Sequence, residues 1–597
     1  MVIRNQHNQN HLYTTIYYFP RKSLSWISRR KVQQGFRNRF LSVFGKNQLD
    51  KGVKISDDHN MKPIYALIVC NLIVLILGCT TQVMTNASRF DIFPQAAQMQ
   101  VVNLSSGDVF DLEAGVVYNG INGKLVQMFA YNKQIPGPLL RVKQNSTVTV
   151  SFKNVLDMPT TVHWHGVRVQ NKYDGVPHGE EGLVLPNASI VYELRFPDEG
   201  VYWYHSHVRE DMQQELGLYG GILVEPIQEG YYNHVDREEV VFIDDIRLVN
   251  NELEYFPSNE SNYALMGRFG TQMFVNGNDE YVVDLKTNQS LRLFLINSAN
   301  TRIFNISIGN FTLRVVGGDS GLYEQEFFAQ SVVLAPGERV VIEVIFPNSG
   351  DYNIMHTVPS NVYTLGRIRV RGESSQVANA SKLRKHVFIQ KNIDKFRKYF
   401  NTSPDIEINL TLKMVGINQS DNTNMDFQDM TMHQDHMMMN HDNIMMGNKN
   451  RMIDDSAALE KPISIEWEDT MAVMNKMSTS KSIQWVLLDQ KSGKQGMDVM
   501  YDVHVGDVKN IRFFNDPDSV HPMQHPMHLH GQRFLVLSEN GIRNTNLVWK
   551  DVVLIQKGGI VDVLVDFSNP GLWMLHCHIA EHLESGMMSL FNVTKMQ

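Results

Sequence analysis

Three segments of this 597-residue chain lie far apart and align with one another without gaps. They read RVKQNSTVTVSFKN (141–154), DLKTNQSLRLFLIN (284–297) and DVHVGDVKNIRFFN (502–515). Each has an apolar second residue, alternating apolar residues near its end and a final Asn. The alternation is typical of strands with one buried face, and its threefold recurrence indicates three copies of one β-domain. We therefore predict an all-β protein with sandwich or barrel domains at about residues 98–228, 229–375 and 460–597.

Residues 376–459, between the second and third predicted domains, are expected to form a linker. Within it, residues 425–446 contain eight Met and three His with almost no Val, Leu or Ile. A segment with so few core-forming residues is typical of a low-complexity insert.

The first 79 residues differ from the rest in charge and hydropathy. Residues 1–60 carry 11 Lys or Arg against 3 Asp or Glu, although the whole chain has a net charge of -8 and offers no general case for binding nucleic acid. A 15-residue apolar run then ends in LILGC, which resembles a bacterial lipoprotein processing site with Cys79 as the lipidated residue. The run suits a signal peptide and is shorter than the ~20 residues of a membrane span.

Two interpretations of this region stay open. Either residues 1–60 are an extension that is not translated, before a signal segment at 61–79, or they are a cytoplasmic basic segment before a membrane anchor. Both place the body of the protein outside the cytoplasm, in the periplasm or anchored to the membrane and facing it.

Cysteine usage excludes a disulfide framework. The chain has three cysteines, and two of them, Cys70 and Cys79, belong to the apolar run. Cys577 is therefore the one cysteine of the predicted folded body, which favours a special chemical role over a structural one.

Ten of the 22 histidines fall in four short clusters, each of which contains an H-x-H pair. On an extended strand, side chains two residues apart point to the same face, so each pair presents two imidazoles side by side. Eight imidazoles can hold three metal ions, and they come from the first and third domains, so we expect a metal site between those domains. The pairs are His163/His165, His205/His207, His528/His530 and His576/His578.

Cys577 lies between His576 and His578 and should point to the opposite face, where His525, His582 and Met587 can join it. Two His, one Cys and a weak axial Met form the ligand set of a blue-copper electron-transfer site. Adjacent residues would then serve two metal sites on the order of 10 Å apart. Structural zinc is a weaker alternative, because it favours closed sets of four ligands that are rich in Cys. Isolated histidines are interpreted as surface or core residues: His178, His234, His356, His386 and His521.

These motifs resemble those of three-domain multicopper oxidases, the family of laccases, ascorbate oxidase and bacterial copper-efflux oxidases. HWHG, YHSH, HPMHLHG and HCHIAEHLESGM are similar to its four copper motifs, and NKQIPGPLLRV and GLYGGILVE to its first domain. The resemblance covers about residues 98–597. It implies three cupredoxin domains of Greek-key topology and four copper ions, one of type 1, one of type 2 and two of type 3.

The resemblance also implies which residues hold each ion. Type 1 copper would take His525, Cys577 and His582, with Met587 axial. Type 2 copper would take His163 and His528. One type 3 copper would take His165, His205 and His578, and the other His207, His530 and His576.

The family oxidises a reductant at type 1 copper, one electron at a time, and reduces dioxygen to two waters. Asp174, in YDGVP, matches a family acid near type 2 copper that is thought to relay protons; the alternative is a turn-forming Asp-Gly. Glu581 and Glu584 lie near the type 1 ligands without an assigned role.

The Met-rich insert favours Cu(I) as the reductant, because thioether sulfur selects Cu(I) and bacterial copper-efflux oxidases carry similar segments. The predicted entry residues are Met430, Met432, Met437, Met438, Met439, Met445 and Met446. Alternatives are a laccase-like enzyme acting on phenols, a ferroxidase or manganese oxidase, and a copper-sequestering protein. A copper-free scaffold is disfavoured because every ligand position is filled, and a two-domain nitrite reductase because it lacks the His-Cys-His link.

Overall fold

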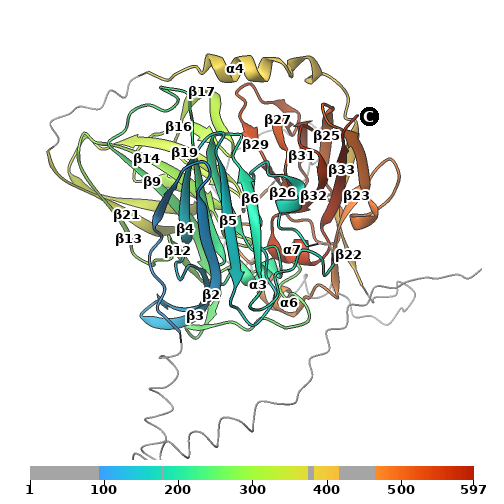
Figure 1. Cartoon of the computed structure of the whole chain (residues 1–597), viewed down its shortest axis with the longest axis horizontal. Helices are drawn as coiled ribbons and strands as arrows, with labels where there is room; N and C mark the ends of the chain where they lie inside the picture. The colour runs from blue at the N-terminus through green and yellow to red at the C-terminus, as the bar shows by residue number, and fades with distance from the viewer. Residues whose placement is uncertain (1–92, 178, 374–381, 416–463, 597) are drawn as a thin grey trace, which may run out of the picture. The chain divides into compact units, whose positions relative to one another are not determined.

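The structure is a computed structural model that describes residues 93–177, 179–373, 382–415 and 464–596 (Figure 1). Strands dominate these residues, and each α-helix among them is four to eight residues long, which confirms the predicted all-β class. The predicted segments 1–60 and 61–79, with Cys79, lie outside the described residues, as do the insert 425–446 and His178. The α-helices of the described residues are α3 (Glu210–Gln213), α4 (Val387–Asp394), α6 (Ala472–Met477) and α7 (Ala580–Glu584).

The first unit consists of two four-stranded sheets around one apolar core. One sheet has the order β1 (Val101–Leu104), β4 (Gly137–Lys143), β8 (Tyr219–Glu225) and β7 (Gly200–His205). The other has the order β3 (Lys124–Tyr131), β2 (Val109–Ile121), β5 (Thr147–Asn154) and β6 (Ser189–Arg195). A short 3-10 helix, η1 (Asn171–Tyr173), precedes Asp174.

The middle unit has one six-stranded and one five-stranded sheet. The six strands, in order, are β12 (Gln272–Val275), β9 (Arg237–Ile246), β14 (Ser290–Asn297), β19 (Arg339–Ile345), β16 (Leu313–Gly318) and β17 (Gly321–Ala329). The five are β13 (Tyr281–Thr287), β21 (Asn361–Glu373), β20 (Gly350–Val358), β15 (Phe304–Ile308) and β18 (Val332–Leu334). A separate hairpin pairs β10 (Leu248–Val249) with β11 (Glu252–Leu253).

The third unit carries two of the four histidine motifs, together with Cys577 and Met587. Its larger sheet has the order β23 (Ile483–Asp489), β22 (Ile406–Met414), β25 (Val508–Asn515), β31 (Ile560–Asp566), β27 (Arg533–Glu539) and β28 (Ile542–Arg543), and β29 (Trp549–Lys550) also pairs with β27. Its smaller sheet has the order β24 (Met500–His504), β33 (Met588–Thr594), β32 (Gly571–Cys577), β26 (His525–Leu529) and β30 (Val552–Ile555). The remaining 3-10 helices of the described residues are η2 (Arg397–Tyr399) and η3 (Gly496–Asp498).

The larger sheet of the third unit includes a strand that precedes residue 460, the predicted start of the third domain. Strand β22 lies inside the predicted linker 376–459, yet it pairs with β23 on one side and β25 on the other. Its sequence, IEINLTLKM, alternates apolar and polar residues, and Ile408, Leu410 and Leu412 are buried in the core of this unit. The alternation therefore gave a local strand signal that the prediction overlooked.

The three repeated segments adopt the same pair of strands in each unit. The first strand of each pair lies parallel to the last strand of its own unit: β4 with β8, β13 with β21 and β24 with β33. The second lies parallel to an earlier strand: β5 with β2, β14 with β9 and β25 with β22. The final Asn is buried each time and its amide donates to backbone carbonyls beyond the strand: Asn154, Asn297 and Asn515. The repeated Asn is thus a structural device, since buried carbonyls need donors.

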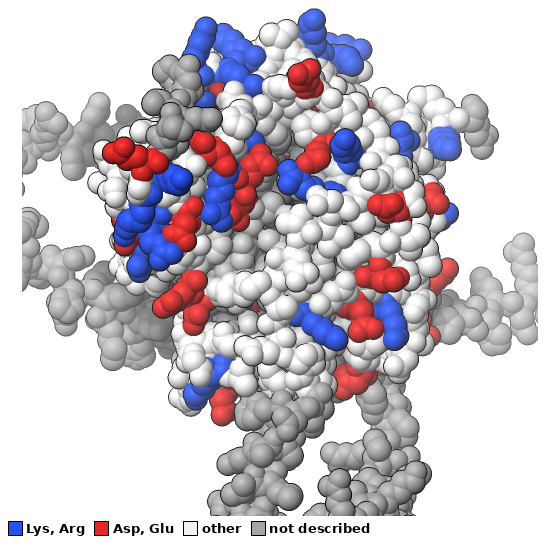
Figure 2. All heavy atoms as spheres, turned by 60° about the vertical axis from the view of Figure 1, so that its left-hand side comes forward, with Lys and Arg blue, Asp and Glu red and all other residues white. Residues whose placement is uncertain are grey.

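A shared apolar cluster holds the three units together. It includes Trp203 of the first unit, Phe294 of the middle unit and Leu535 of the third. Helix α4, which crosses the top of the view in Figure 1, adds Ile389 and Ile393 to the same cluster. On the face in Figure 2, Lys and Arg side chains are interspersed with Asp and Glu. Among the described residues, no helix combines the length and the apolar character that crossing a membrane requires.

Candidate metal centre

The backbone brings the four H-x-H pairs together by pairing their strands. His163 forms a bridge with His205 at the end of β7, and two backbone hydrogen bonds of 2.8 and 3.1 Å join them. In the third unit, His528 of β26 is the register partner of His576 of β32. The His163–His205 bridge and the β26–β32 strand pair therefore each contribute one half of the site.

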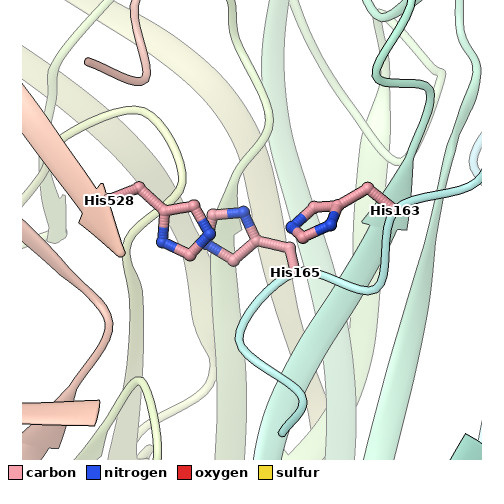
Figure 3. Close-up of side chains that lie close together, drawn as sticks. All are labelled: His163, His165 and His528. Atoms are coloured by element: carbon pink, nitrogen blue, oxygen red, sulfur yellow. The ribbon is translucent and has the colours of Figure 1, made fainter. Parts of the chain in front are cut away.

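The eight paired imidazoles converge between the first and third units, and none is more than 9% exposed. In Figure 3, His163 and His165 of the first unit approach His528 of the third. The rings of His165 and His528 are stacked, with centroids 3.8 Å apart. Ligand atoms lie within 4.8 Å of one another in three all-histidine groups: His165, His205 and His578; His207, His530 and His576; and His163, His165 and His528.

Half of these rings are oriented by a hydrogen bond from Nδ1 to a carbonyl. A carbonyl oxygen lies 2.8–2.9 Å from Nδ1 in four of them, and because a carbonyl only accepts, Nδ1 carries the proton and Nε2 keeps a lone pair. The pairs are His163 with Asp174, His205 with Ser206, His528 with Asp551, and His576 with Cys577.

Several of the free nitrogens have no partner within the protein. The Nε2 atoms of His163, His205, His207 and His528 are buried without a hydrogen bond. Buried nitrogen lone pairs left unpaired are costly, and a bound metal ion would satisfy them. Because imidazole nitrogen is a good ligand for copper, the donor set fits the copper ions that the sequence motifs imply.

Burial makes the neutral form prevail in seven of these imidazoles, and His163 is the exception. Desolvation lowers the pKa of His207 to about 3 and that of His576 to about 4, against the ordinary 6.5. It also lowers the pKa of His528 and His530, and neighbouring histidines add to the shift. Neutral imidazole is the form that binds a metal, so these seven rings are already in the metal-binding form at neutral pH.

These shifts predict how the copper-free protein responds to acid. Below pH 6.5 the unfolded chain protonates His207, whereas the folded chain does not until about pH 3. The neutral ring thus contributes stability that is complete above pH 6.5 and is lost as the pH falls, at up to about 1.4 kcal/mol per pH unit. His207→Asn should therefore make the free energy of unfolding fall less steeply between pH ~6 and ~4, by about one proton, in urea titrations. Equal slopes for the two proteins would contradict the lowered pKa.

Cys577 belongs to a second, separate group. Its Sγ lies 3.6 Å from Nδ1 of His525 and 3.7 Å from Nδ1 of His582, and these two nitrogens are 3.3 Å apart. All three residues are buried, and desolvation raises the pKa of the Cys577 thiol. A bound cation would hold the sulfur as thiolate, as metal ligation generally does. Met587 is also buried, and its carbonyl accepts the Cys577 N–H at 3.1 Å.

The structure therefore separates the side chains of neighbouring residues. His576 Nε2 lies 2.9 Å from His530 Nε2 and His578 Nε2 lies 3.2 Å from His165 Nδ1, whereas Cys577 joins His525 and His582 instead. The backbone from His576 to His578 is shared by both groups.

Asp174 contacts the histidine cluster from outside. Its Oδ2 lies 3.0 Å from His530 Nδ1 and its Oδ1 3.3 Å from His163 Nδ1. Burial by itself lowers the pKa of His163, but the charge and hydrogen bonds of Asp174 outweigh it and raise that pKa. Asp174 thus contacts both rings through its side chain.

Acidic residues that sequence reasoning missed or left unranked lie in the short helices α3 and α7. Glu210 follows His207 by three residues and places Oε1 2.9 Å from His205 Nδ1; its closeness to YHSH was the one available signal. Glu584 accepts the Glu210 N–H at 3.2 Å. Desolvation and the charge of Asp211 raise the pKa of Glu581 to about 7 and that of Glu584 to about 8. Arg339 and Asp551, which form an ion pair beside His165, were also missed.

Comparison with known proteins matches this arrangement. Models described as multicopper oxidase match residues 116–229, 232–374 and 467–597. The multicopper oxidase mco of Staphylococcus aureus is 24% identical over 483 residues, which cover 79% of this chain and 85% of that protein. Copper resistance protein A of Pseudomonas syringae pv. tomato is 35% identical over 150 residues, covering 25% of this chain and 24% of that one.

The fold has solved relatives as well. A multicopper oxidase of Campylobacter jejuni, described as a metallo-oxidase, aligns with a TM-score of 0.59 at 22% identity and covers 84% of this chain and 96% of its own. The matched models lie in all three units, including the outer two that share the histidine cluster. The chain accordingly belongs to the multicopper oxidase family, whose members are copper-dependent oxidoreductases.

Proposed function

We propose that this oxidase takes electrons from Cu(I) and passes them to dioxygen in copper tolerance. The balanced reaction is four Cu(I), one dioxygen and four protons giving four Cu(II) and two waters. The observation that carries the proposal is the shared segment His576–His578, whose backbone joins the Cys577 group to the eight-imidazole cluster. Copper bound at these residues would supply the one-electron chemistry.

The proposed ligands are drawn from these groups of neighbouring side chains. His525, Cys577 and His582, with Met587 axial, would hold type 1 copper. His163 and His528 would hold type 2 copper. His165, His205 and His578 would hold one type 3 copper, and His207, His530 and His576 the other. The stoichiometry of one type 1, one type 2 and two type 3 ions belongs to the same proposal.

Asp174 is proposed to deliver protons to the site of oxygen reduction. Its two oxygens contact His530 and His163, and a carboxyl group beside a reaction that consumes protons can act as a general acid.

Methionines that pack against the core of the third unit support Cu(I) as the reductant. Met471 and Met474, at the start and middle of α6, are half-buried and pack against the apolar cluster that contains Cys577 and Met587. Met477, at the end of α6, is 67% exposed. Thioether sulfur prefers Cu(I) to Cu(II). The similarity to copper resistance protein A agrees with this choice.

The Met-rich insert is proposed to collect Cu(I) through Met430, Met432, Met437, Met438, Met439, Met445 and Met446. An extracytoplasmic location, with anchoring through Cys79, also stays a prediction, because it rests on residues outside the described part of the chain.

Oxygen uptake by the copper-loaded protein tests the substrate. We expect uptake with Cu(I) to exceed uptake with a methoxyphenol, and Met471→Leu with Met474→Leu to lower uptake at limiting Cu(I) roughly tenfold, which corresponds to ~1.4 kcal/mol of lost binding. Deletion of residues 425–446 should also lower the Cu(I) rate and leave the phenol rate unchanged. Met128→Leu, a buried methionine of the first unit, is the matched control.

Other outcomes would favour a different function, or a different role for the insert. Faster turnover of the phenol than of Cu(I) would favour the laccase alternative, with the insert as an accessory. Binding of extra Cu(I) without oxygen uptake would favour sequestration. Unchanged Cu(I) turnover after deletion of the insert would exclude it as the entry site.

A further inference from the structure

The middle unit contributes none of the proposed ligands, yet one of its turns lies against the histidine cluster. Gly337, between β18 and β19, has φ +83, and a Cβ added there would lie 3.0 Å from Cδ2 of His578 and 3.1 Å from Cε1 of His165. Both the positive φ and the close approach favour glycine. The turn therefore lies directly against two imidazoles, one from each outer unit.

Arg339, two residues on, binds all three units at once. It is buried, and its two terminal nitrogens each lie 2.6 Å from a carboxylate oxygen of Asp551 in the third unit. Its Nε donates to the carbonyl of Val201 in the first unit at 3.0 Å. Its Nη1 donates to the carbonyl of Gly337, in the turn of the middle unit, at 3.1 Å. A bidentate pair of this kind fixes the plane of the carboxylate.

Asp551 in turn fixes one ring of the cluster. Its Oδ1 lies 3.0 Å from Nε2 of His165. A carboxylate only accepts, so Nε2 of His165 carries the proton and the lone pair lies on Nδ1. That Nδ1 is 3.2 Å from Nε2 of His578. His165 thus faces the cluster through Nδ1, opposite to the rings that are held at Nδ1 by a carbonyl.

We propose that Arg339 and Asp551 are positioning residues, through which the middle unit sets the orientation and tautomer of His165 for copper. The inference rests on the proposed function, because it needs His165 as a ligand. Partners that orient a metal-binding histidine typically change metal affinity 10–100-fold when they are removed.

Two replacements of similar size separate this role from a merely structural one. Asp551→Asn and Asp551→Leu both remove the ion pair with Arg339, but Asn keeps an acceptor oxygen for His165. Arg339 donates to the same Oδ1 that faces His165, so the amide oxygen should occupy that position. We expect Asn to retain the copper of the cluster and Leu to bind it roughly 10–100-fold more weakly.

Copper is measured per chain by elemental analysis after dialysis against a chelator of graded strength. The blue absorption of the Cys577 group is the internal reference and should persist in both variants. Thermal melting of the copper-free proteins monitors the fold. Since Leu leaves a buried guanidinium unpaired, Arg339→Met with Asp551→Leu supplies an apolar pair that should fold well and still lose cluster copper.

Glu343→Leu is the matched control. Glu343 is a buried carboxylate of the middle unit that pairs with Arg292 and contacts no proposed ligand. The Glu343→Leu substitution should lower the melting temperature and leave the number of copper ions per chain unchanged.

The outcomes are distinct. Full cluster copper in both Leu variants, or equal loss with Asn and with Leu, would overturn the positioning role. Failure of the wild-type protein itself to take up cluster copper would instead overturn the proposed function.

Discussion

Cys577→Ser is expected to abolish blue colour and turnover while the fold and the cluster copper survive. The sulfur lies 3.6 and 3.7 Å from the two Nδ1 atoms of its group, and its residue also joins that group to His576 and His578. A serine oxygen is a hard donor that does not replace a soft thiolate in a blue-copper set. Burying a hydroxyl in place of a thiol costs about 1–3 kcal/mol, which a large folded domain tolerates.

The measurements are visible absorption, oxygen uptake with Cu(I), and copper per chain. The variant should bind about one copper fewer than the wild-type protein and show no detectable uptake. Met587→Leu is the matched control in the same group, because an axial thioether is a weak ligand that tunes potential; it should keep its blue colour and turn over. A blue, active serine variant would exclude Cys577 as the entry point for electrons.

Asp174→Asn is expected to slow turnover by about 10²–10⁴-fold, the typical contribution of a general acid. Asparagine keeps an acceptor beside His530 Nδ1, where the Asp174 Oδ2 lies at 3.0 Å, so the rings should stay in place. The amide does not exchange a proton as a carboxyl does. The copper content and the blue colour should therefore equal those of the wild-type protein, and the loss should appear in oxygen reduction.

A single-turnover experiment locates that loss. The variant is first bleached with a stoichiometric amount of reductant and then mixed with air-saturated buffer. The return of the blue colour should slow by the same factor as turnover. Asp198→Asn serves as control, since Asp198 pairs with Arg168 and Arg533 without contacting the cluster. Normal recolouring in Asp174→Asn would show that Asp174 supplies no protons, and a lost copper ion would assign it to holding the rings alone.

Much of the fold was readable from local pattern. The three repeated segments predicted three β-units, and each folds into the same strand pair ending in a buried Asn. The period of two along a strand predicted that His576 and Cys577 would serve different groups, because neighbouring side chains on a strand point to opposite faces. Strand β22 shows the limit of the domain prediction: its alternation was visible, but its partners β23 and β25 are distant in sequence.

The residues that surround the proposed ligands could not be recognised from the sequence. Arg339 and Asp551 are separated by 212 residues, and each taken alone is an ordinary charged residue near a strand. Met471 and Met474, which we propose favour Cu(I), likewise lack a motif, and only the fold shows that they pack against the core that contains Cys577.

The sequence by itself determined the ligand types and their spacing, because an H-x-H pair on a strand presents two rings to one face whatever surrounds it. His205 and His576 are oriented locally, by the carbonyl of the next residue. Only tertiary structure decided which nitrogen of His163 and of His165 faces the cluster. That choice depends on one hydrogen bond at the back of the ring, which His163 donates to a carbonyl and His165 donates to the Asp551 carboxylate. For His165 the acceptor is brought there only by the packing of the three units.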